Sequence, residues 1–216
     1  MILSRGRGYI FVHIPKTGGT SMARALEARA MADDILIGDT PKARKRRGRL
    51  KGLAARGRLW KHSTLADIDG VVSSEEIAGM FTFALVRNPW DRLVSYYHWL
   101  QTQGFDHPAV HLAKELDFAG FLRHPQTSAS IGGSPYGSYM RCADGVERVS
   151  AWLRLEHLAE DMAPLAEHLG FVPEVPHDNR SDRSTDYRRY YPDDLAEVLG
   201  AICAEDIARF GYRFDG

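Results

Sequence analysis

The stretch "YIFVHIPKTGGTS", residues 9–21, decides the fold. It opens with apolar and aromatic residues typical of a buried strand, expected over 9–14, and the Ala-rich stretch from Ser21 to about Ala32 favours a helix. A tight glycine turn between a strand and a helix lies at the positive end of the helix, where unsatisfied N–H groups favour an anion. The sequence therefore predicts an anion-binding loop directly after the first strand.

The residue types of this loop suit an anion better than a plain turn. Gly18 and Gly19 let the backbone pass close to a ligand, Lys16 adds a mobile positive charge, and hydroxyl groups add donors. The expected ligand-binding residues are Pro15, Lys16, Thr17, Gly18, Gly19, Thr20 and Ser21. The alternative is a Gly-Gly turn that binds nothing, which gives no reason for so many donors side by side.

The order of the loop residues argues against a nucleoside triphosphatase. The phosphate loop of those enzymes places its lysine after the last glycine, beside the hydroxyl that holds Mg²⁺. Here Lys16 precedes both glycines, and the later strand "FTFALVR" (81–87) ends in Arg rather than in a metal-binding Asp. We therefore expect a nucleotide that transfers no phosphate, and no metal ion.

Arg87 marks a second candidate anion site. It ends a buried-type strand, and ligands gather at the carboxyl ends of parallel strands. The sequence "NPWDRLVSYYHWLQ" (88–101) then predicts a helix with Asn88 as N-cap, and Ser95 lies one turn after Asp91. A guanidinium can hold a phosphate with two parallel hydrogen bonds. The alternative is that Arg87 only pairs with Asp91.

Strands and helices alternate along the remaining chain, which predicts one α/β domain with a parallel sheet covered on both faces. A third strand is expected in "VSAWLRLE" (149–156). Residues 125–145 and 172–188 are expected to be loop. The other expected helices are 73–80 with a Ser-x-x-Glu cap, 117–124 capped by Asp117, 157–170, and one long helix over 192–211.

The charge of the chain is balanced but unevenly placed. Ten of the 28 Lys and Arg residues, and no Asp or Glu, lie between Lys42 and Lys61, which is expected to be an inserted basic loop with at most one short helix. This run is either a surface that faces an anion or a solvated loop. No apolar run is long enough to cross a membrane, and two cysteines without metal-ligand spacing favour a cytoplasmic protein.

Taken together, "FVHIPKTGGTS" and "FALVRNPWDRLVSYYHW" resemble the sulfotransferases that use PAPS, 3′-phosphoadenosine 5′-phosphosulfate. The resemblance is to the carbohydrate branch of heparan 2-O and chondroitin 4-O type, as a small, bacterial-type member. It covers nearly the whole chain and includes "WLRLEHLAEDMAPLAEHLGF". It implies a single domain over 1–216 with a P-loop-like three-layer fold, a central parallel sheet flanked by helices.

The resemblance also implies roles for individual residues. Lys16 would stabilise the charge on the leaving group, and His62, which lies between the two motifs, would be the catalytic base. His98 and Glu115 are the other candidates for the catalytic base. Arg87 and Ser95 would hold the 3′-phosphate of PAPS. A polar loop that contains Asn179, Ser181 and Arg183 would fold over the adenine or the 3′-phosphate, and the alternative is a solvated loop.

Two other functions compete with sulfuryl transfer. One is a small-molecule kinase or nucleotide hydrolase with an atypical loop, and the position of Lys16 argues against it. The other is a module that binds an anionic polymer through residues 42–61, but this run lacks the interleaved aromatic residues of nucleic-acid binders, and no nucleic acid is expected. We expect PAPS and a hydroxyl acceptor, which an anionic carbohydrate would fit, as partners.

Overall fold

The computed structural model describes residues 1–176, 184, 186–192 and 194–215, and the described residues form two compact units. The first unit holds residues 1–86 and 136–176. The second holds residues 87–135 and the described residues from 184 onward. Each unit has a hydrophobic core of its own. The single domain expected from the sequence stays a prediction.

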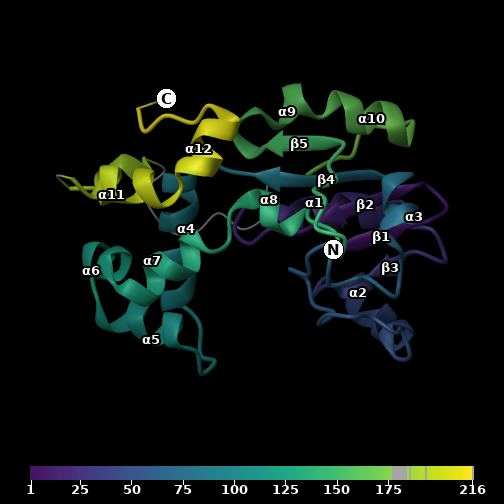
Figure 1. Ribbon diagram of the computed structural model, residues 1–216, viewed down its shortest axis with the longest axis horizontal. Helices are drawn as coiled ribbons and strands as arrows, with labels where there is room; N and C mark the ends of the chain where they lie inside the picture. Colours follow the sequence, from purple (N-terminus) through teal and green to yellow (C-terminus); the bar gives the residue numbers. More distant parts are fainter. Residues whose placement is uncertain (177–183, 185, 193, 216) are drawn as a thin grey trace. The chain divides into compact units, whose positions relative to one another are not determined.

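A sheet of five strands, counted over the described residues, forms the centre of the first unit (Figure 1). Its order is β3-β1-β2-β4-β5, and β4 is parallel to both β2 and β5, which confirms the α/β prediction. The strands are β1 (Ile2–Ser4), β2 (Tyr9–Val12), β3 (Ile35–Leu36), β4 (Phe81–Val86) and β5 (Ala151–Arg154). The anion loop and Arg87 therefore follow the carboxyl ends of two adjacent parallel strands.

The two remaining strands make the sheet mixed rather than wholly parallel. β1 pairs antiparallel with β2 and with β3, and neither β1 nor β3 was expected. The turn between β1 and β2 is closed by the N–H of Gly8, which donates to the carbonyl of Arg5 at 3.1 Å with a φ of +63° at Gly8. Two apolar runs on either side of a glycine-containing turn are a hairpin signal that could have predicted β1.

Burial on both faces explains why β2 and β4 read as continuous apolar runs. Phe11 on one face and Val12 on the other are both fully buried, as are Phe83 and Ala84 of β4. On the Phe11 side the sheet packs against the helix that follows the loop, α1 (Gly19–Ala28). This packing fixes the start of α1 at the end of β2.

The described residues contain further helical segments in both units. In the first unit these are α2 (Pro41–Arg46), η1 (Arg47–Leu50), α3 (Ser74–Ala78), α8 (Tyr136–Tyr139), η2 (Leu155–His157), α9 (Leu158–Asp161) and α10 (Ala163–Leu169). In the second they are α4 (Pro89–Gln101), α5 (Pro108–Glu115), α6 (Phe118–Arg123), α7 (Pro125–Gly132), η3 (Tyr187–Tyr190), α11 (Leu195–Ile202) and α12 (Ala204–Phe210). The core of the second unit is rich in aromatic residues of α4 and α6.

The capping signals predicted from the sequence are confirmed. Ser73 and Glu76 form a capping box at α3, the Asn88 side chain accepts from the Trp90 N–H at the start of α4, and Asp117 caps α6. Each of these side chains satisfies a backbone donor that the first turn of a helix leaves without an intrahelical partner.

Two expectations about helices are wrong. Residues 125–145 contain α7 and α8, and α7 begins with Pro125, because proline is well suited to the first position of a helix. The long helix expected over 192–211 is divided into α11 and α12 at Cys203, whose backbone lies outside the helical region with φ −103° and ψ 21°.

Candidate functional site

The loop from His13 to Ser21 presents an uncapped helix start. Gly18 is the N-cap residue of α1 with a φ of +84°, and it offers no side chain to the helix. The first turn of α1 contains no acidic residue. The carbonyl of Gly18 accepts from the N–H groups of Ser21 and Met22. Both the dipole and the N–H groups at this end of α1 thus favour an anion.

The hydroxyl groups of the loop are placed differently from one another. Thr17 is fully buried, and its hydroxyl donates to the carbonyl of Ile14 at 2.9 Å, so it stabilises the turn itself. Thr20 is exposed, and Ser21 is buried in the first turn of α1. Thr20 and Ser21 are therefore the hydroxyl donors available to a ligand at this end of the helix.

Lys16 lies in the middle of the loop in a left-handed conformation. Its φ is +66°, and among the residues that the structure describes it is the only one other than glycine with a positive φ. Such a conformation costs a residue with a Cβ roughly 1 kcal/mol or more, and strain of this kind clusters at functional sites. Lys16 is partly exposed, so its amine can reach a ligand.

His62 joins the loop although it is 49 residues away from His13 in the chain. Its Nδ1 lies 2.7 Å from the carbonyl oxygen of His13, and because a carbonyl only accepts, Nδ1 carries the proton and Nε2 keeps its lone pair. Burial lowers the pKa of His62 to about 4, and the charge of Lys61 acts in the same direction. The imidazole is therefore neutral near pH 7 and able to accept a proton at Nε2.

His13 is a residue of this site that sequence reasoning missed. Its ring is buried and lies edge to face with that of His62, with ring centroids 4.7 Å apart and planes at 73°. Burial holds the pKa of His13 well below its ordinary value. Its position just after β2, where ligands gather at the end of a parallel strand, was the available signal.

Arg87 forms the ion pair that was the alternative to phosphate binding. Its Nε and Nη2 donate to the same carboxylate oxygen of Asp91 at 2.8 and 2.5 Å. Ser95, the next predicted ligand, is buried in α4 four residues after Asp91. Asp91 therefore orients the guanidinium, and the pair by itself does not decide between a structural and a ligand-binding role.

The remaining candidates have different outcomes. His98 donates from Nδ1 to the carbonyl of Val94 within α4, and Glu115 is exposed at the end of α5. Asn179, Ser181 and Arg183 lie outside the described residues. Among the candidate bases, the one that the structure brings to the anion loop is His62.

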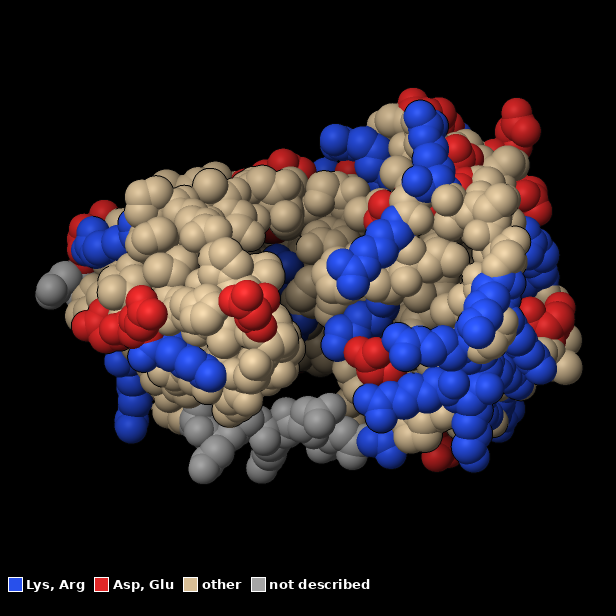
Figure 2. All heavy atoms as spheres, turned by 90° about the horizontal axis from the view of Figure 1, so that it is seen from below, with Lys and Arg blue, Asp and Glu red and all other residues tan. Residues whose placement is uncertain are grey.

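The first part of the basic segment, residues 42–50, folds in α2 and η1, and the charges of residues 42–51 divide into two sets. Lys42, Arg46 and Arg49 donate to backbone carbonyls at and beyond the end of α1, those of Glu27, Met31 and Ala32. Four exposed side chains have neither a hydrogen bond nor an ion pair to any residue that the structure describes: Arg44, Lys45, Arg47 and Lys51. Figure 2 shows the resulting concentration of positive charge on this face. The segment is thus a folded element with one docked and one outward basic set.

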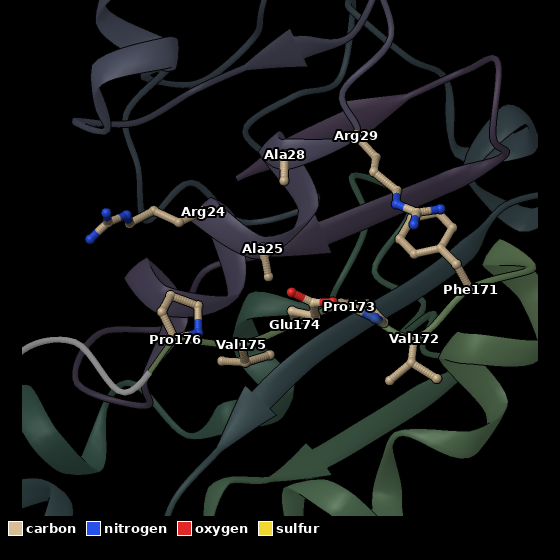
Figure 3. Close-up of a pocket in the computed structure, with 10 residues that line it drawn as sticks. All are labelled: Arg24, Ala25, Ala28, Arg29, Phe171, Val172, Pro173, Glu174, Val175 and Pro176. Carbon is tan, nitrogen blue, oxygen red and sulfur yellow. The ribbon is translucent and has the colours of Figure 1, made fainter.

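A groove of about 640 Å³ lies elsewhere in the first unit, between α1 and residues 171–176 (Figure 3). The guanidinium of Arg29 lies over the ring of Phe171, 4.4 Å from its centroid. The groove is lined by the side of α1 that includes Ala25 and Ala28, and none of the predicted site residues lines it. It is therefore separate from the anion loop.

Three further features of the described part of the chain concern metal ions, cysteines and membranes. It contains no group of three or more His, Cys, Asp and Glu residues that could hold a metal ion. Both cysteines, Cys142 and Cys203, are buried and free. None of its helices has the length and apolar character needed to cross a membrane.

Comparison with known proteins identifies the family. The model of the sulfotransferase family matches residues 1–213. Among solved structures, a mouse sulfotransferase, SULT7A1, complexed with PAP, has the same fold with a TM-score of 0.52 and 16% identity over 94% of this chain and 85% of that one. A search of curated proteins gave no match. The prediction of a PAPS-dependent sulfotransferase is thereby confirmed at the level of the family: the chain belongs to the sulfotransferase family.

Proposed function

We propose that this sulfotransferase moves the sulfuryl group of PAPS to a hydroxyl group of a carbohydrate or glycoconjugate by in-line displacement. The observation that carries the proposal is the uncapped, acid-free start of α1 beside a lysine in a left-handed conformation. This arrangement fits the 5′-phosphosulfate of PAPS, which is an anion with several acceptor oxygens. The mouse sulfotransferase of the same fold was solved with PAP, the product that PAPS becomes, which supports this choice of donor.

Sulfuryl transfer needs alignment and charge stabilisation more than covalent catalysis, as phosphoryl transfer does. The bond between sulfur and the bridging oxygen breaks, its electron pair stays on the 5′-phosphate of PAP, and sulfur bonds to the acceptor oxygen. Lys16 stabilises the charge that develops on the bridging oxygen, with the N–H groups at the start of α1 around the phosphate.

The acceptor hydroxyl loses its proton in the same reaction. His62 takes this proton at Nε2, because its Nδ1–H is held by the His13 carbonyl. At neutral pH the imidazole is in the accepting form, since burial lowers its pKa to about 4. His62 and Lys16 are therefore the proposed catalytic residues.

The 3′-phosphate of PAPS is assigned to the second motif. Arg87 and Ser95 bind it, and Ser181 and Arg183, which the family resemblance implies, bind the adenine or the 3′-phosphate. Asp91 fixes the guanidinium of Arg87 through two hydrogen bonds to one oxygen. The carbohydrate branch, a cytoplasmic location, a single domain and a reaction without metal complete the proposal and rest on the sequence.

Calorimetry with three nucleotides tests the donor assignment. Wild-type protein should bind PAP without added metal and should bind ATP with Mg²⁺ much more weakly. Arg87→Ala should weaken PAP binding by about 10- to 100-fold, the loss expected for a hydrogen-bonded charge pair. Its affinity for adenosine 5′-phosphosulfate, which has no 3′-phosphate, should change little.

The matched control is Arg123→Ala in the same unit, because Arg123 forms an exposed ion pair with Asp194 and should not affect either ligand. Equal losses for both ligands in Arg87→Ala would place Arg87 outside the 3′-phosphate site. Absence of PAP binding to the wild-type protein would overturn the donor. Transfer of ³⁵S from labelled PAPS to a panel of sugars then identifies the acceptor.

A further inference from the structure

The side chain of His13 occupies the space between the anion loop and His62, and the proposed reaction gives it no task. The residue is 7% exposed. None of the residues that the structure describes forms a hydrogen bond with either of its ring nitrogens; only its backbone carbonyl is engaged, by His62. The ring nitrogens of His13 are not among the buried side-chain atoms that lack a hydrogen-bond partner. The position of the ring is therefore explained by its packing contacts.

Gly19 shows where the ring of His13 lies. Gly19 is the first residue of α1 and has no positive φ, so its backbone conformation does not require glycine. A Cβ at this position would overlap Cδ2, Nε2 and Cγ of His13. Because a Cβ in a helix tilts toward the helix N-terminus, the imidazole edge fills the space at the N-terminal side of the first turn. The second glycine of the loop thus makes room for a ring.

The ring of His13 in turn contacts the candidate base. The rings of His13 and His62 meet edge to face at 4.7 Å, and that of His62 meets the exposed ring of Trp60 at 5.0 Å and 87°. The backbone of Trp60 is fixed by Ser63, whose hydroxyl accepts a hydrogen bond from the Trp60 N–H and donates one to the Trp60 carbonyl. A row of three rings therefore leads from the start of α1 to the surface, with His62 in the middle.

We propose that His13 is a positioning residue for His62, and that Gly19 is glycine in order to admit the His13 ring. His13 holds His62 in two ways: its carbonyl fixes the Nδ1–H tautomer, and its ring closes one side of the imidazole against solvent. This inference rests on the proposed function for its meaning in catalysis. Its geometry concerns residues of the first unit alone.

The first test is an NMR titration of His62 in His13→Ala, which removes the ring and leaves the carbonyl. Solvent should reach His62 and raise its pKa from about 4 by about one pH unit or more, toward the ordinary value of a histidine. The matched control is Val12→Ala, a fully buried neighbour in β2, which should leave this pKa unchanged. The charged groups that act on His62 are Lys61, Asp39 and the Met1 amino group, and all three stay in place.

The second test is a thermal-unfolding cycle with Gly19→Ala. In the wild-type background the new Cβ overlaps the ring, so the unfolding midpoint should fall. In the His13→Ala background the same change should raise it, because alanine favours a helix more than glycine does. If His13→Ala does not fold, His13→Ser, which removes the ring and leaves only a small hydroxyl, takes its place in both tests.

The outcomes separate the two proposals. An unchanged His62 pKa in His13→Ala, or an equal loss of midpoint from Gly19→Ala in both backgrounds, overturns the positioning role. PAP binding to the wild-type protein tests the proposed function independently, and His13→Ala should retain it within about threefold because no hydrogen bond to the anion is removed. Once an acceptor is identified, the acid limb of the pH–rate profile of His13→Ala should shift to higher pH, because the pKa of His62 rises.

Discussion

Both the charge and the backbone conformation of Lys16 indicate a functional role. The sequence places a lysine before the glycines, and the structure places that lysine at a φ of +66°. A residue with a Cβ is held in this region only where the surroundings or a function demand it. Glycine adopts a positive φ without strain, and two of the three residues that follow Lys16 are glycines. The amine is therefore the reason to keep lysine here.

Two substitutions at Lys16 separate strain from charge. Lys16→Ala keeps the Cβ and removes the amine, so turnover should fall by roughly 100-fold or more while PAP binding changes far less, because the amine acts on charge that develops during transfer. Lys16→Gly should lose turnover equally but gain about 1 kcal/mol of folding free energy, because glycine adopts a positive φ without strain.

Measurements of ³⁵S transfer, calorimetry and urea unfolding on the two variants check this. Near-normal turnover in either variant would remove Lys16 from the reaction. Equal stability of the alanine and glycine variants would show that the left-handed conformation is not strained.

At the residue scale, the sequence predicts what local chemistry determines and misses what packing determines. Lys16, the glycines and the hydroxyl residues are recognisable because they are consecutive. His13 belongs to the same consecutive run, but the residues it contacts are Gly19 and His62. The contact with His62 joins residues 49 positions apart in the chain. The neutral state of His62 is a product of burial, which no residue pattern displays.

At the scale of elements, α2 and η1 show that the first part of the basic segment is folded rather than a solvated loop. Lys42 and Arg46 donate to backbone carbonyls at the end of α1 and beyond it, which is where cations stabilise a helix terminus. Thr40 caps α2 and also donates to the Glu27 carboxylate, at 2.7 Å to each oxygen. The segment is therefore anchored, and its outward set faces solvent on a folded surface.

The outward basic set should bind anionic polymers without contributing to stability. Replacing Arg44, Lys45, Arg47 and Lys51 by Gln should shift elution from heparin resin to lower salt and leave the unfolding midpoint nearly unchanged, because exposed charges act mainly through attraction that salt screens beyond about 8 Å. The matched control replaces Lys42, Arg46 and Arg49 by Gln, which should lower the midpoint because these side chains satisfy backbone carbonyls.

Co-elution of the outward variant with the wild-type protein would remove the binding role. If the acceptor proves to be anionic, the same variant should raise acceptor KM and leave donor KM unchanged, since the donor loop contains none of these residues. A neutral acceptor predicts no kinetic change.

Element types were predictable where the signal is local, as with the caps at Ser73, Asn88 and Asp117. The sequence also predicted β2 and β4, whose apolar runs reflect burial on both faces. β3 was missed because its two residues are too few to show a pattern, and its assignment depends on pairing with β1. Tertiary pairing, rather than propensity, decides such elements.

At the scale of the whole molecule, the buried imidazoles link folding to pH. The pKa of His62 is about 4 in the folded state and near 6.5 when unfolded, and that of His13 is lowered in the same direction. Between these values the unfolded chain binds more protons than the folded one, so stability rises with pH. Burial raises the pKa of Glu27, which acts in the opposite direction as the pH falls. A single variant is therefore needed to isolate the imidazole.

His62→Gln isolates it, because glutamine can still donate to the carbonyl of His13 and does not titrate. The contribution of His62 is complete above pH 6.5 and is lost as the pH falls toward 4, by about 3 kcal/mol in total at 1.36 kcal/mol per pKa unit. Urea unfolding at pH 7.5, 6, 5 and 4 should therefore show a steeper loss of stability in the wild-type protein than in the variant. Parallel curves for the two proteins would mean that His62 titrates normally in the folded state, which would contradict the lowering of its pKa by burial.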